Sequence, residues 1–307
     1  MKRAGFLLFF NLFLAGWIRP HAAEDKIKVF VSILPEAYFV ERIGDAQVDA
    51  NVMVGPGQNP HAFEPTPKLM AQLSKAAIYF RIGVPFEDVL MKRLQRSNPS
   101  MKIVDLREGI KLLPMIEHHH EEDAENHPSD EHATGSNEKD EEAQEGAKDP
   151  HIWLSPKLAK IQSQTIAETL AAFDPNHAEE YRSNLKKLLG ELDRLDEEIT
   201  KLFQNLRERR FMVYHPAWGY FADAYTMEQI PIEMEGKEPT AKQLVELIEL
   251  AKSQNIKIIF VQKQFSANNA KTVAKAIGGQ VVSIDPLAKD YFTNMRATAR
   301  ALYEALK

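Results

Sequence analysis

Three histidines and one aspartate hold positions from which a folded chain could bring them to one point. His61 ends a turn-rich stretch, His151 follows a long acidic segment, and His215 and Asp285 each follow an apolar run. Imidazole and carboxylate are the zinc ligands left to a chain without cysteine, and four of them complete a tetrahedron. A single histidine or aspartate beside proline is more often an ordinary turn residue, so the metal prediction rests on the four together.

A second set of histidines lies in a low-complexity acidic insertion, residues 117–149. The insertion holds no large apolar residue, so it buries too little surface to offset its ordering entropy, and we expect a disordered loop within the first lobe. One interpretation is a solvated acidic spacer, and the other is weak secondary zinc binding that gathers the metal beside the main site. Its histidines are His118, His119, His120, His127 and His132.

The first 23 residues have the layout of a secretory signal peptide. Lys2 and Arg3 precede an apolar run at residues 4–18, and Arg-Pro-His-Ala-Ala follows it before the first charged residues of the mature chain. The run is shorter than the roughly 20 residues that cross a bilayer, which favours a cleaved signal over a membrane anchor. Because the chain has no cysteine for a disulfide or a lipid anchor, we expect a freely diffusing periplasmic protein.

Residues 24–155 and 209–307 each predict a lobe of alternating strands and helices. The expected strands are 28–33, 48–54, 77–83 and 101–106 in the first lobe, and 211–214, 230–234, 256–262 and 280–284 in the second. Strands separated by helices form parallel sheets covered on both faces, so we predict an α/β protein with two Rossmann-like lobes of mostly parallel four-stranded sheets. Ligands of such sheets bind beyond the carboxyl ends of strands, where His61, His215 and Asp285 are placed.

Residues 156–208 connect the lobes and predict two helices, the second running from about residue 176 to 208. Its apolar residues recur at alternating spacings of four and three, which indicates one continuous apolar stripe. The stripe is also compatible with a free coiled-coil dimer. Because α/β lobes lie on both sides of it in the same chain, we favour a long rigid helix that joins the lobes of a monomer, with the metal in the cleft between them.

Five stretches carry a family resemblance: NPHAFEPTP at 59–67, DPHIWLSP at 149–156, VYHPAWGYFA at 213–222, KEPTAKQL at 237–244 and SIDPLAKDY at 283–291. In this order they resemble the signatures of the periplasmic zinc-binding components of ABC importers, the metal-binding branch of the solute-binding proteins known as cluster A-I or family 9. A histidine-rich acidic insertion before the second stretch is a recurrent feature of the zinc members. The resemblance implies capture of Zn²⁺ as a transported ligand, with an inner-membrane permease and its cytoplasmic ATPase as partners.

The same resemblance implies that His61, His151 and His215 are imidazole ligands of zinc. Asp285 matches the position of a fourth, carboxylate ligand, which some zinc members replace with water. Related manganese importers carry glutamate at the position of His215, and a third imidazole suits zinc better than manganese. One departure is Gln262, where many relatives carry an acidic residue. It leaves the ligand set untouched but removes a carboxylate that could help hold the lobes near the cleft.

These observations predict a binding protein and not an enzyme, because four protein ligands close the zinc site to a reactive water. The alternatives are a manganese- or iron-binding protein of the same family and, if Asp285 does not bind the metal, a secreted zinc hydrolase. The chain shows no basic stripe suited to nucleic acid. We therefore expect no nucleic-acid partner.

Overall fold

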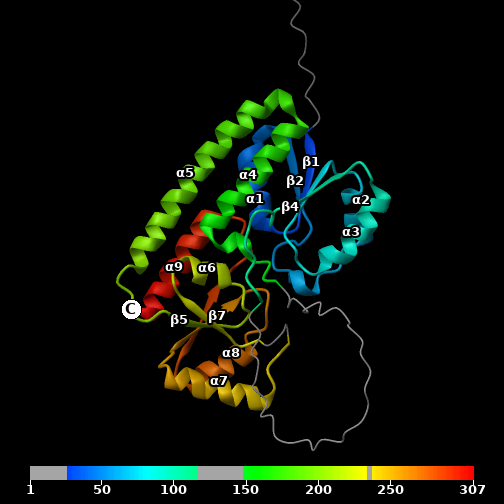
Figure 1. Cartoon of the computed structure of the whole chain (residues 1–307). Coiled ribbons are helices and arrows are strands. Elements are labelled where there is room, and N and C mark those ends of the chain that lie inside the picture. Colours follow the sequence, from blue (N-terminus) through cyan, green and yellow to red (C-terminus); the bar gives the residue numbers. More distant parts are fainter. Residues whose placement is uncertain (1–25, 116–147, 234–236) are drawn as a thin grey trace, which may run out of the picture.

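The computed structural model describes residues 26–115, 148–233 and 237–307, which form two α/β lobes beside a long helix (Figure 1). The predicted signal peptide and the five histidines of the acidic insertion lie outside these residues. None of the helices within the described ranges combines the length and the apolar composition that a membrane span requires. The prediction of an α/β protein with two parallel four-stranded sheets and a long helix is confirmed.

The first lobe contains a fully parallel sheet with the strand order β2-β1-β3-β4. Its strands are β1 (Ile27–Val31), β2 (Val48–Val52), β3 (Ile78–Arg81) and β4 (Lys102–Asp105). The main helices of this lobe are α1 (Leu34–Gly44), α2 (Pro67–Leu73) and α3 (Phe86–Ser97). Val29, Phe30 and Val31 are fully buried, as expected for a parallel strand covered on both faces.

The second lobe repeats this order as β6-β5-β7-β8, again fully parallel. Its strands are β5 (Arg210–Val213), β6 (Glu228–Pro231), β7 (Ile258–Gln262) and β8 (Gln280–Ile284). Its helices are α6 (Gly219–Ala224), α7 (Ala241–Ser253), α8 (Asn268–Ala276) and α9 (Tyr291–Leu306). In each sheet the strand order reverses beside the first strand, and α/β sheets bind ligands at the carboxyl ends next to such a reversal.

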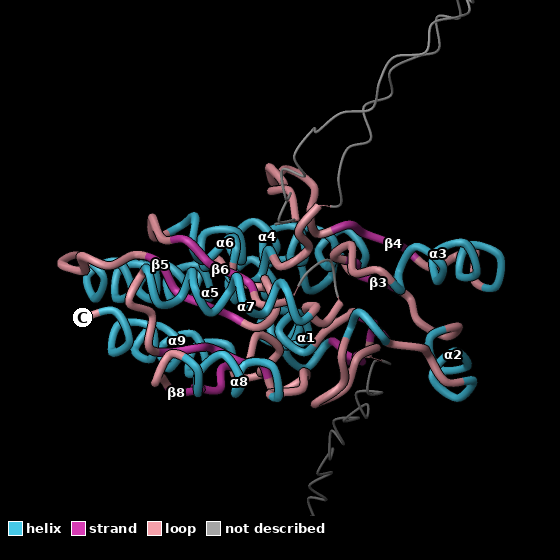
Figure 2. The backbone as a smooth tube through the Cα atoms, turned by 90° about the horizontal axis from the view of Figure 1, so that it is seen from below, coloured by secondary structure: helices cyan, strands magenta, loops and turns pink. Residues whose placement is uncertain are grey.

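Two helices connect the lobes, α4 (Pro156–Phe173) and α5 (Ala178–Phe203). Helix α5 contacts the other connecting helix α4, α1 of the first lobe and α9 of the second. Figure 2 shows the two sheets toward opposite ends of the elongated molecule. The buried residues of α5 form one stripe: Tyr181, Leu188, Leu192, Leu195, Ile199 and Phe203. Because this stripe packs on both lobes, it ties them together.

Two ion pairs fix the position of α5 relative to each lobe. The guanidinium of Arg42 on α1 donates to both oxygens of Glu191, at 2.6 and 3.1 Å. The guanidinium of Arg296 on α9 does the same to Glu198, at 2.6 and 3.2 Å. Partly exposed pairs of this kind add little stability, but their two-pronged geometry favours one alignment of the helices.

The sequence pattern predicts lobe helices at 35–43, 66–73, 240–254, 268–277 and 291–306. It therefore missed α3 and α6, and it made the long connecting helix too long. Helix α6 has only six residues, too few to show a helical period. Helix α3 buries Leu90, Met91 and Leu94, but the charged residues between them obscured the pattern. The long helix ends at Phe203 rather than near residue 208. Leu206 continues the apolar spacing and is buried, but through a turn in which its N–H donates to Phe203 O at 3.1 Å.

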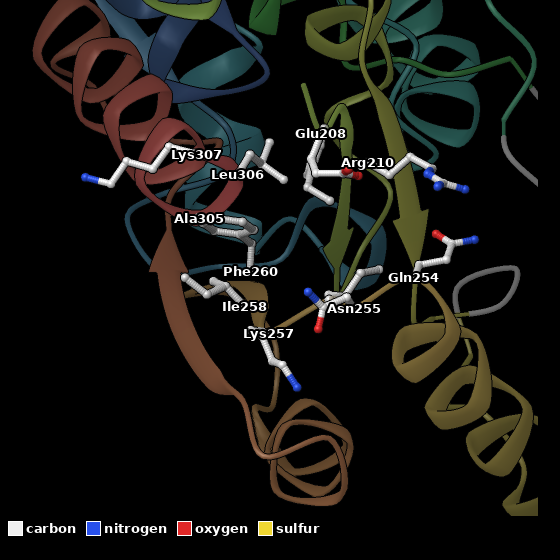
Figure 3. Close-up of a pocket in the computed structure, with 12 residues that line it drawn as sticks. Glu208, Arg210, Gln254, Asn255, Lys257, Ile258, Phe260, Ala305, Leu306 and Lys307 are labelled. Carbon is white, nitrogen blue, oxygen red and sulfur yellow. The ribbon is translucent and has the colours of Figure 1, made fainter. Parts of the chain in front are cut away.

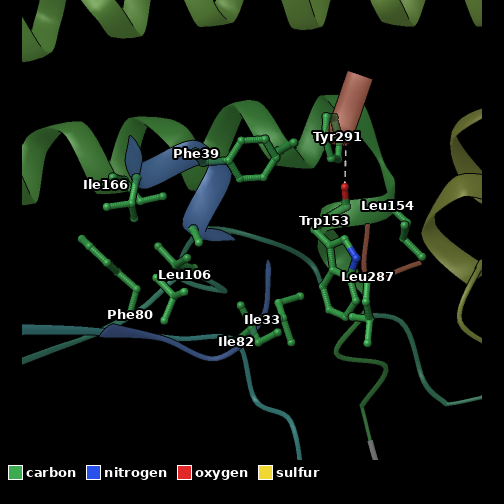
Figure 4. Packing of buried hydrophobic residues seen from close by; sticks show 14 of the residues in the cluster. Ile33, Phe39, Phe80, Ile82, Leu106, Trp153, Leu154, Ile166, Leu287 and Tyr291 are labelled. Atoms are coloured by element: carbon green, nitrogen blue, oxygen red, sulfur yellow. Dashed lines mark hydrogen bonds between the residues drawn. The ribbon is translucent and has the colours of Figure 1, made fainter. Parts of the chain in front are cut away.

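Trp153 joins the two lobes and lines the same pocket as the three histidines, and Figure 4 shows it near Leu287 and Tyr291. It lies in a short 3-10 helix, Ile152–Leu154, and its indole Nε1 donates to Pro286 O at 2.7 Å. The hydroxyl of Tyr291 donates to Trp153 O at 2.8 Å, and the Tyr291 ring packs edge-on against Phe39 of the first lobe. The contact between the lobes is therefore a packed, hydrogen-bonded joint.

Tyr220 on α6 fixes both ends of the acidic insertion. Its hydroxyl accepts from Leu113 N at 3.0 Å and donates to Asp149 O at 2.9 Å. The ends also pair with each other, since Asp149 N donates to Leu113 O at 2.9 Å and an antiparallel bridge joins Pro114 to Lys148. The chain therefore resumes at a fixed point, two residues before His151.

We expect Leu192→Ala to lower the free energy of unfolding by about 2–5 kcal/mol, because Leu192 is fully buried in the middle of α5. Urea titration followed by circular dichroism measures the change. The control is Glu197→Ala on the exposed face of the same helix, which should stay within about 0.5 kcal/mol of the parent protein. Equal stabilities of the two variants would contradict the joining role of the α5 stripe.

Candidate metal centre

The structure brings His61, His151 and His215 together between the lobes. One ring nitrogen of each lies within 4.8 Å of the others, and among the described residues this is the one cluster of three or more potential metal-ligating side chains. The ring centroids are 4.6 to 5.9 Å apart. Three residues that are distant in the sequence thus form one group, as expected for ligands of a single ion.

Local structure sets each histidine in place. His61 lies in a short 3-10 helix, Pro60–Ala62, whose first turn is capped when Asn59 Oδ1 accepts from His61 N at 2.9 Å. His151 comes directly before the 3-10 helix that carries Trp153. His215 follows the end of β5 by two residues. His61 and His151 thus precede the connecting helices, whereas His215 belongs to the second lobe.

A buried carboxylate orients the ring of His151. Asp149 Oδ1 accepts from the backbone N–H of His151 at 2.9 Å and from its ring Nδ1 at 2.6 Å. The ring thus turns Nε2 toward the other two histidines, the usual arrangement for a ligating histidine whose Nδ1 donates to a carboxylate. The approach requires Gly219, because a Cβ at that position would lie 2.7 Å from Asp149 Oδ2.

Three neighbours hold His215. Its ring Nδ1 donates to Glu233 Oε2 at 3.2 Å, which again directs a bare Nε2 to the cluster. The side chain of Gln262 binds the backbone of His215 from both sides, accepting from its N–H at 3.2 Å and donating to its carbonyl at 2.5 Å. The ring of Phe265 stacks on the imidazole at 4.7 Å between centroids. An ionised acid in place of Gln262 could accept from the N–H but could not donate to the carbonyl.

The spacing of the two bare nitrogens matches a tetrahedral metal. His151 Nε2 and His215 Nε2 are 3.4 Å apart. Two nitrogens bound to zinc at 2.0–2.1 Å and separated by the tetrahedral angle would lie about 3.3–3.4 Å apart. The Nδ1 atoms of these two rings face Asp149 and Glu233, so both Nε2 atoms point into the cluster, as they would around one cation.

The cavity beside the histidines is small and has apolar walls. Its volume is about 20 Å³, and a single water needs roughly 10–15 Å³ by the same measure. Besides the histidines and Gln264, it is lined by Pro60, Val84, Trp153, Phe265, Pro286 and Leu287. The site therefore accommodates an ion and its immediate ligand, and its low polarity strengthens the ion's attraction to its ligands.

Burial keeps at least two of the rings uncharged. It lowers the pKa of His61 from 6.5 to about 3, and the nearby His215 and His151 add to this effect through charge repulsion. Burial also lowers the pKa of His215, although Glu233 opposes the shift. Only the neutral ring binds a metal. The folded site therefore holds His61 and His215 in the metal-binding form at neutral pH.

Asp285 stands apart from the histidine cluster. It follows β8 as predicted, but none of its oxygens belongs to the group within 4.8 Å. Its carboxylate instead accepts from Gln264 Nε2 at 2.9 Å and from Leu287 N at 3.0 Å. The structure thus brings together three of the four candidate ligands and places the fourth beside the pocket that Gln264 and Leu287 line.

Sequence reasoning missed the two orienting carboxylates, Asp149 and Glu233. Asp149 had a usable signal, because an aspartate commonly accepts from the N–H two residues later, here that of His151. Glu233 follows β6 by two residues, just as His215 follows the neighbouring β5. Acidic residues at the exits of adjacent parallel strands are therefore a second usable signal.

Two α/β lobes on a connecting helix, with three imidazoles gathered between them, define a metal-binding protein of the solute-binding type. The family model of the zinc-uptake complex component A, periplasmic (ZnuA), matches residues 29–305. The chain belongs to this family, whose members are transport components and not enzymes.

Individual relatives match over both lobes. The high-affinity zinc uptake system protein ZnuA of Bacillus subtilis is 29% identical over 271 residues, which cover 86% of this chain and 79% of that protein. Zinc-binding protein AdcA of Streptococcus pyogenes is 28% identical over 296 residues, covering 91% of this chain and 56% of AdcA. This chain therefore spans little more than half the length of AdcA.

Solved structures share the fold. A crystal structure of ZnuA superimposes with a TM-score of 0.82 at 40% identity, covering 92% of this chain and 100% of that chain. A ZnuA deletion variant with zinc bound gives a TM-score of 0.80 at 38% identity, covering 92% and 99%. The similarity in fold therefore includes a protein crystallised with zinc.

We expect Asp149→Ala to weaken zinc binding by about 10–100-fold, the usual effect of removing a carboxylate that orients a ligating histidine. Competition against a chromogenic chelator measures the dissociation constant. The control is Asp174→Ala, which removes a carboxylate 2.6 Å from Nδ1 of His177, remote from the cluster. Equal zinc affinity in the two variants would show that Asp149 does not orient a ligand.

We expect the ring of His61 to remain uncharged in the metal-free protein from pH 8 down to pH 5, because its pKa is lowered to about 3. Protonation should therefore begin to compete with metal at this ring only as the pH falls toward 3. The chemical shift of its ring C–H protons, followed by NMR against pH, measures the titration. A midpoint near 6.5 would contradict the expected burial of this ring.

Proposed function

We propose that this protein captures Zn²⁺ in the periplasm with His61, His151 and His215 and delivers it to an inner-membrane ABC permease. One observation carries the proposal: two imidazole Nε2 atoms face each other at the 3.4 Å spacing of zinc ligands, with the third ring beside them. Family membership supports the transport role, because a component of a zinc uptake complex requires a permease. We further propose that it acts as a monomer and that a cytoplasmic ATPase drives the permease.

The size of the site favours ion binding over catalysis. A hydrolase that uses zinc needs room for a substrate beside the metal and a nearby general base. The cavity at the histidines holds about 20 Å³. A larger cavity of about 240 Å³ lies at the amino ends of β5 and β7, and none of its lining residues is a histidine (Figure 3). The secreted zinc hydrolase is thus the weaker alternative.

The ligand set favours zinc over manganese. All three side chains of the cluster are imidazoles, which suit zinc, whereas manganese prefers oxygen ligands. His215 makes the difference between the two, and its ring is held by Glu233, Gln262 and Phe265. A manganese- or iron-binding role remains the alternative within the family.

The joint between the lobes favours capture with little movement. The same buried cluster contains Phe30 of β1, Leu192 of α5 and Phe211 of β5, so one core runs through both lobes and the connecting helix. Wide opening of the cleft would break this core and the bonds of Trp153. We propose that zinc enters through small shifts of the loops that carry the histidines. Weak secondary binding by the insertion histidines stays a prediction.

We expect the purified mature protein to retain zinc and not manganese when both are supplied in equal excess, as measured by elemental analysis after gel filtration. His215→Ala should weaken zinc binding at least about 100-fold in calorimetric titration, since it removes one of three ligands. His177→Ala, outside the cluster, is the control. Unaltered affinity in His215→Ala would remove this residue from the ligand set.

Delivery is tested separately. Proteoliposomes that contain the partner permease and ATPase should take up radioactive zinc only when the zinc-loaded protein and ATP are both present. Uptake that does not depend on the protein would leave metal binding established but refute the transport role.

A further inference from the structure

Asp285 is engaged by its own neighbours and not by the histidines. Its Oδ1 accepts from Gln264 Nε2 at 2.9 Å and from Leu287 N at 3.0 Å. Its Oδ2 lies 3.6 Å from Lys263 Nζ, and the carboxylate side chain is only 18% exposed. To reach the ion, the carboxylate would have to give up the hydrogen bond from Gln264 and shift relative to Leu287.

Gln264 connects Asp285 to the metal pocket. Its side chain lines the same cavity as the three histidines. Its Nε2 donates a hydrogen bond to Asp285. Its Oε1 is buried and has no hydrogen-bond partner within the described part of the chain. A buried amide oxygen without a partner is uncommon and costs free energy, which implies a donor that binds there in the functional state.

Resting on the proposed function, we propose that Gln264 sets the metal preference of the site. Its Nε2 keeps Asp285 out of the coordination sphere, and its Oε1 accepts a hydrogen bond from a water that takes the fourth position on the ion. The cavity of about 20 Å³ has room for one such water. The fourth ligand is then neutral, although the Asp285 carboxylate is hydrogen-bonded to a residue that lines the pocket.

A neutral fourth ligand favours zinc. Manganese is a harder cation than zinc and depends more on anionic oxygen ligands, whereas imidazole nitrogen binds zinc more strongly than manganese. Withholding the Asp285 carboxylate should therefore cost manganese more affinity than zinc. Gln264 acts in this way as a specificity-determining residue, although it supplies no nitrogen to the metal.

The test compares zinc and manganese dissociation constants in the full mature chain. In Gln264→Ala the carboxylate of Asp285 is released, and we expect manganese affinity to rise about tenfold or more, the scale of effects from residues next to ligands. Zinc affinity should change by less than about threefold, so the zinc-to-manganese ratio falls. Gln264→Met, which keeps the length of the side chain but cannot hydrogen-bond, should give the same result if the alanine variant folds poorly.

The expected gain in manganese affinity depends on the carboxylate of Asp285. We therefore expect Gln264→Ala combined with Asp285→Asn to return manganese affinity to the parent value. Gln254→Ala is the matched control, because Gln254 also has a buried Oε1 without a partner but lines the remote cavity in Figure 3. This variant should leave the zinc-to-manganese ratio unchanged.

Three results would overturn the proposal. They are an unchanged metal ratio in both Gln264 variants, a manganese gain that survives Asp285→Asn, and a loss of zinc affinity in Asp285→Asn alone as large as that in His215→Ala. The last would make Asp285 a ligand. In each case the parent protein still binds zinc, so failure of this inference is distinct from failure of the proposed function, which would appear as no preferential zinc binding by the parent.

Discussion

The site depends on the positions of two ring nitrogens, His151 Nε2 and His215 Nε2, which are held 3.4 Å apart. A carboxylate contacts Nδ1 of each ring, so neither ring can turn its Nε2 away from the other without losing that contact. Two nitrogens held at this spacing can bind one tetrahedral ion without moving. The fold therefore provides the distance between two ligands before the ion is captured.

The remainder of the molecule keeps these two rings in place. Tyr220 fixes the chain just before His151, and Gln262 fixes the backbone of His215. Behind them the core continues from one lobe to the other through α5, and Trp153 bonds across the joint. Because the ligands are arranged before the metal arrives, little ordering entropy is lost on binding. The rigid core that joins the lobes thus keeps the ligands of the single ion in place.

The architecture was predictable because it follows from periodic patterns. Alternating strands and helices indicated both sheets, and the leucine stripe indicated α5, although not its end at Phe203. The three histidines were found because strand exits, turns and a family resemblance all pointed to them. Helix α6 escaped notice because six residues show no period.

The surroundings of the ligands were beyond the reach of the sequence, since they depend on close approaches between distant residues. Asp149 fits only because Gly219, 70 positions later, lacks a side chain. In the sequence, Gln262 only lacks the charge that many relatives carry at this position. The fold shows that its side chain binds both the N–H and the carbonyl of His215. Asp285 was expected at the metal, yet Gln264 and Leu287 occupy its carboxylate.

The paired ends of the acidic insertion define a position at which the length of the chain can be changed. Leu113 and Asp149 are locked together by one tyrosine hydroxyl and by their own backbone hydrogen bond, so the separation of the two ends does not depend on what lies between them. Insertions, deletions and shifts in composition can accumulate there without moving the histidine that follows. A reporter domain could therefore be grafted between these two ends while the arrangement of the three histidines is kept.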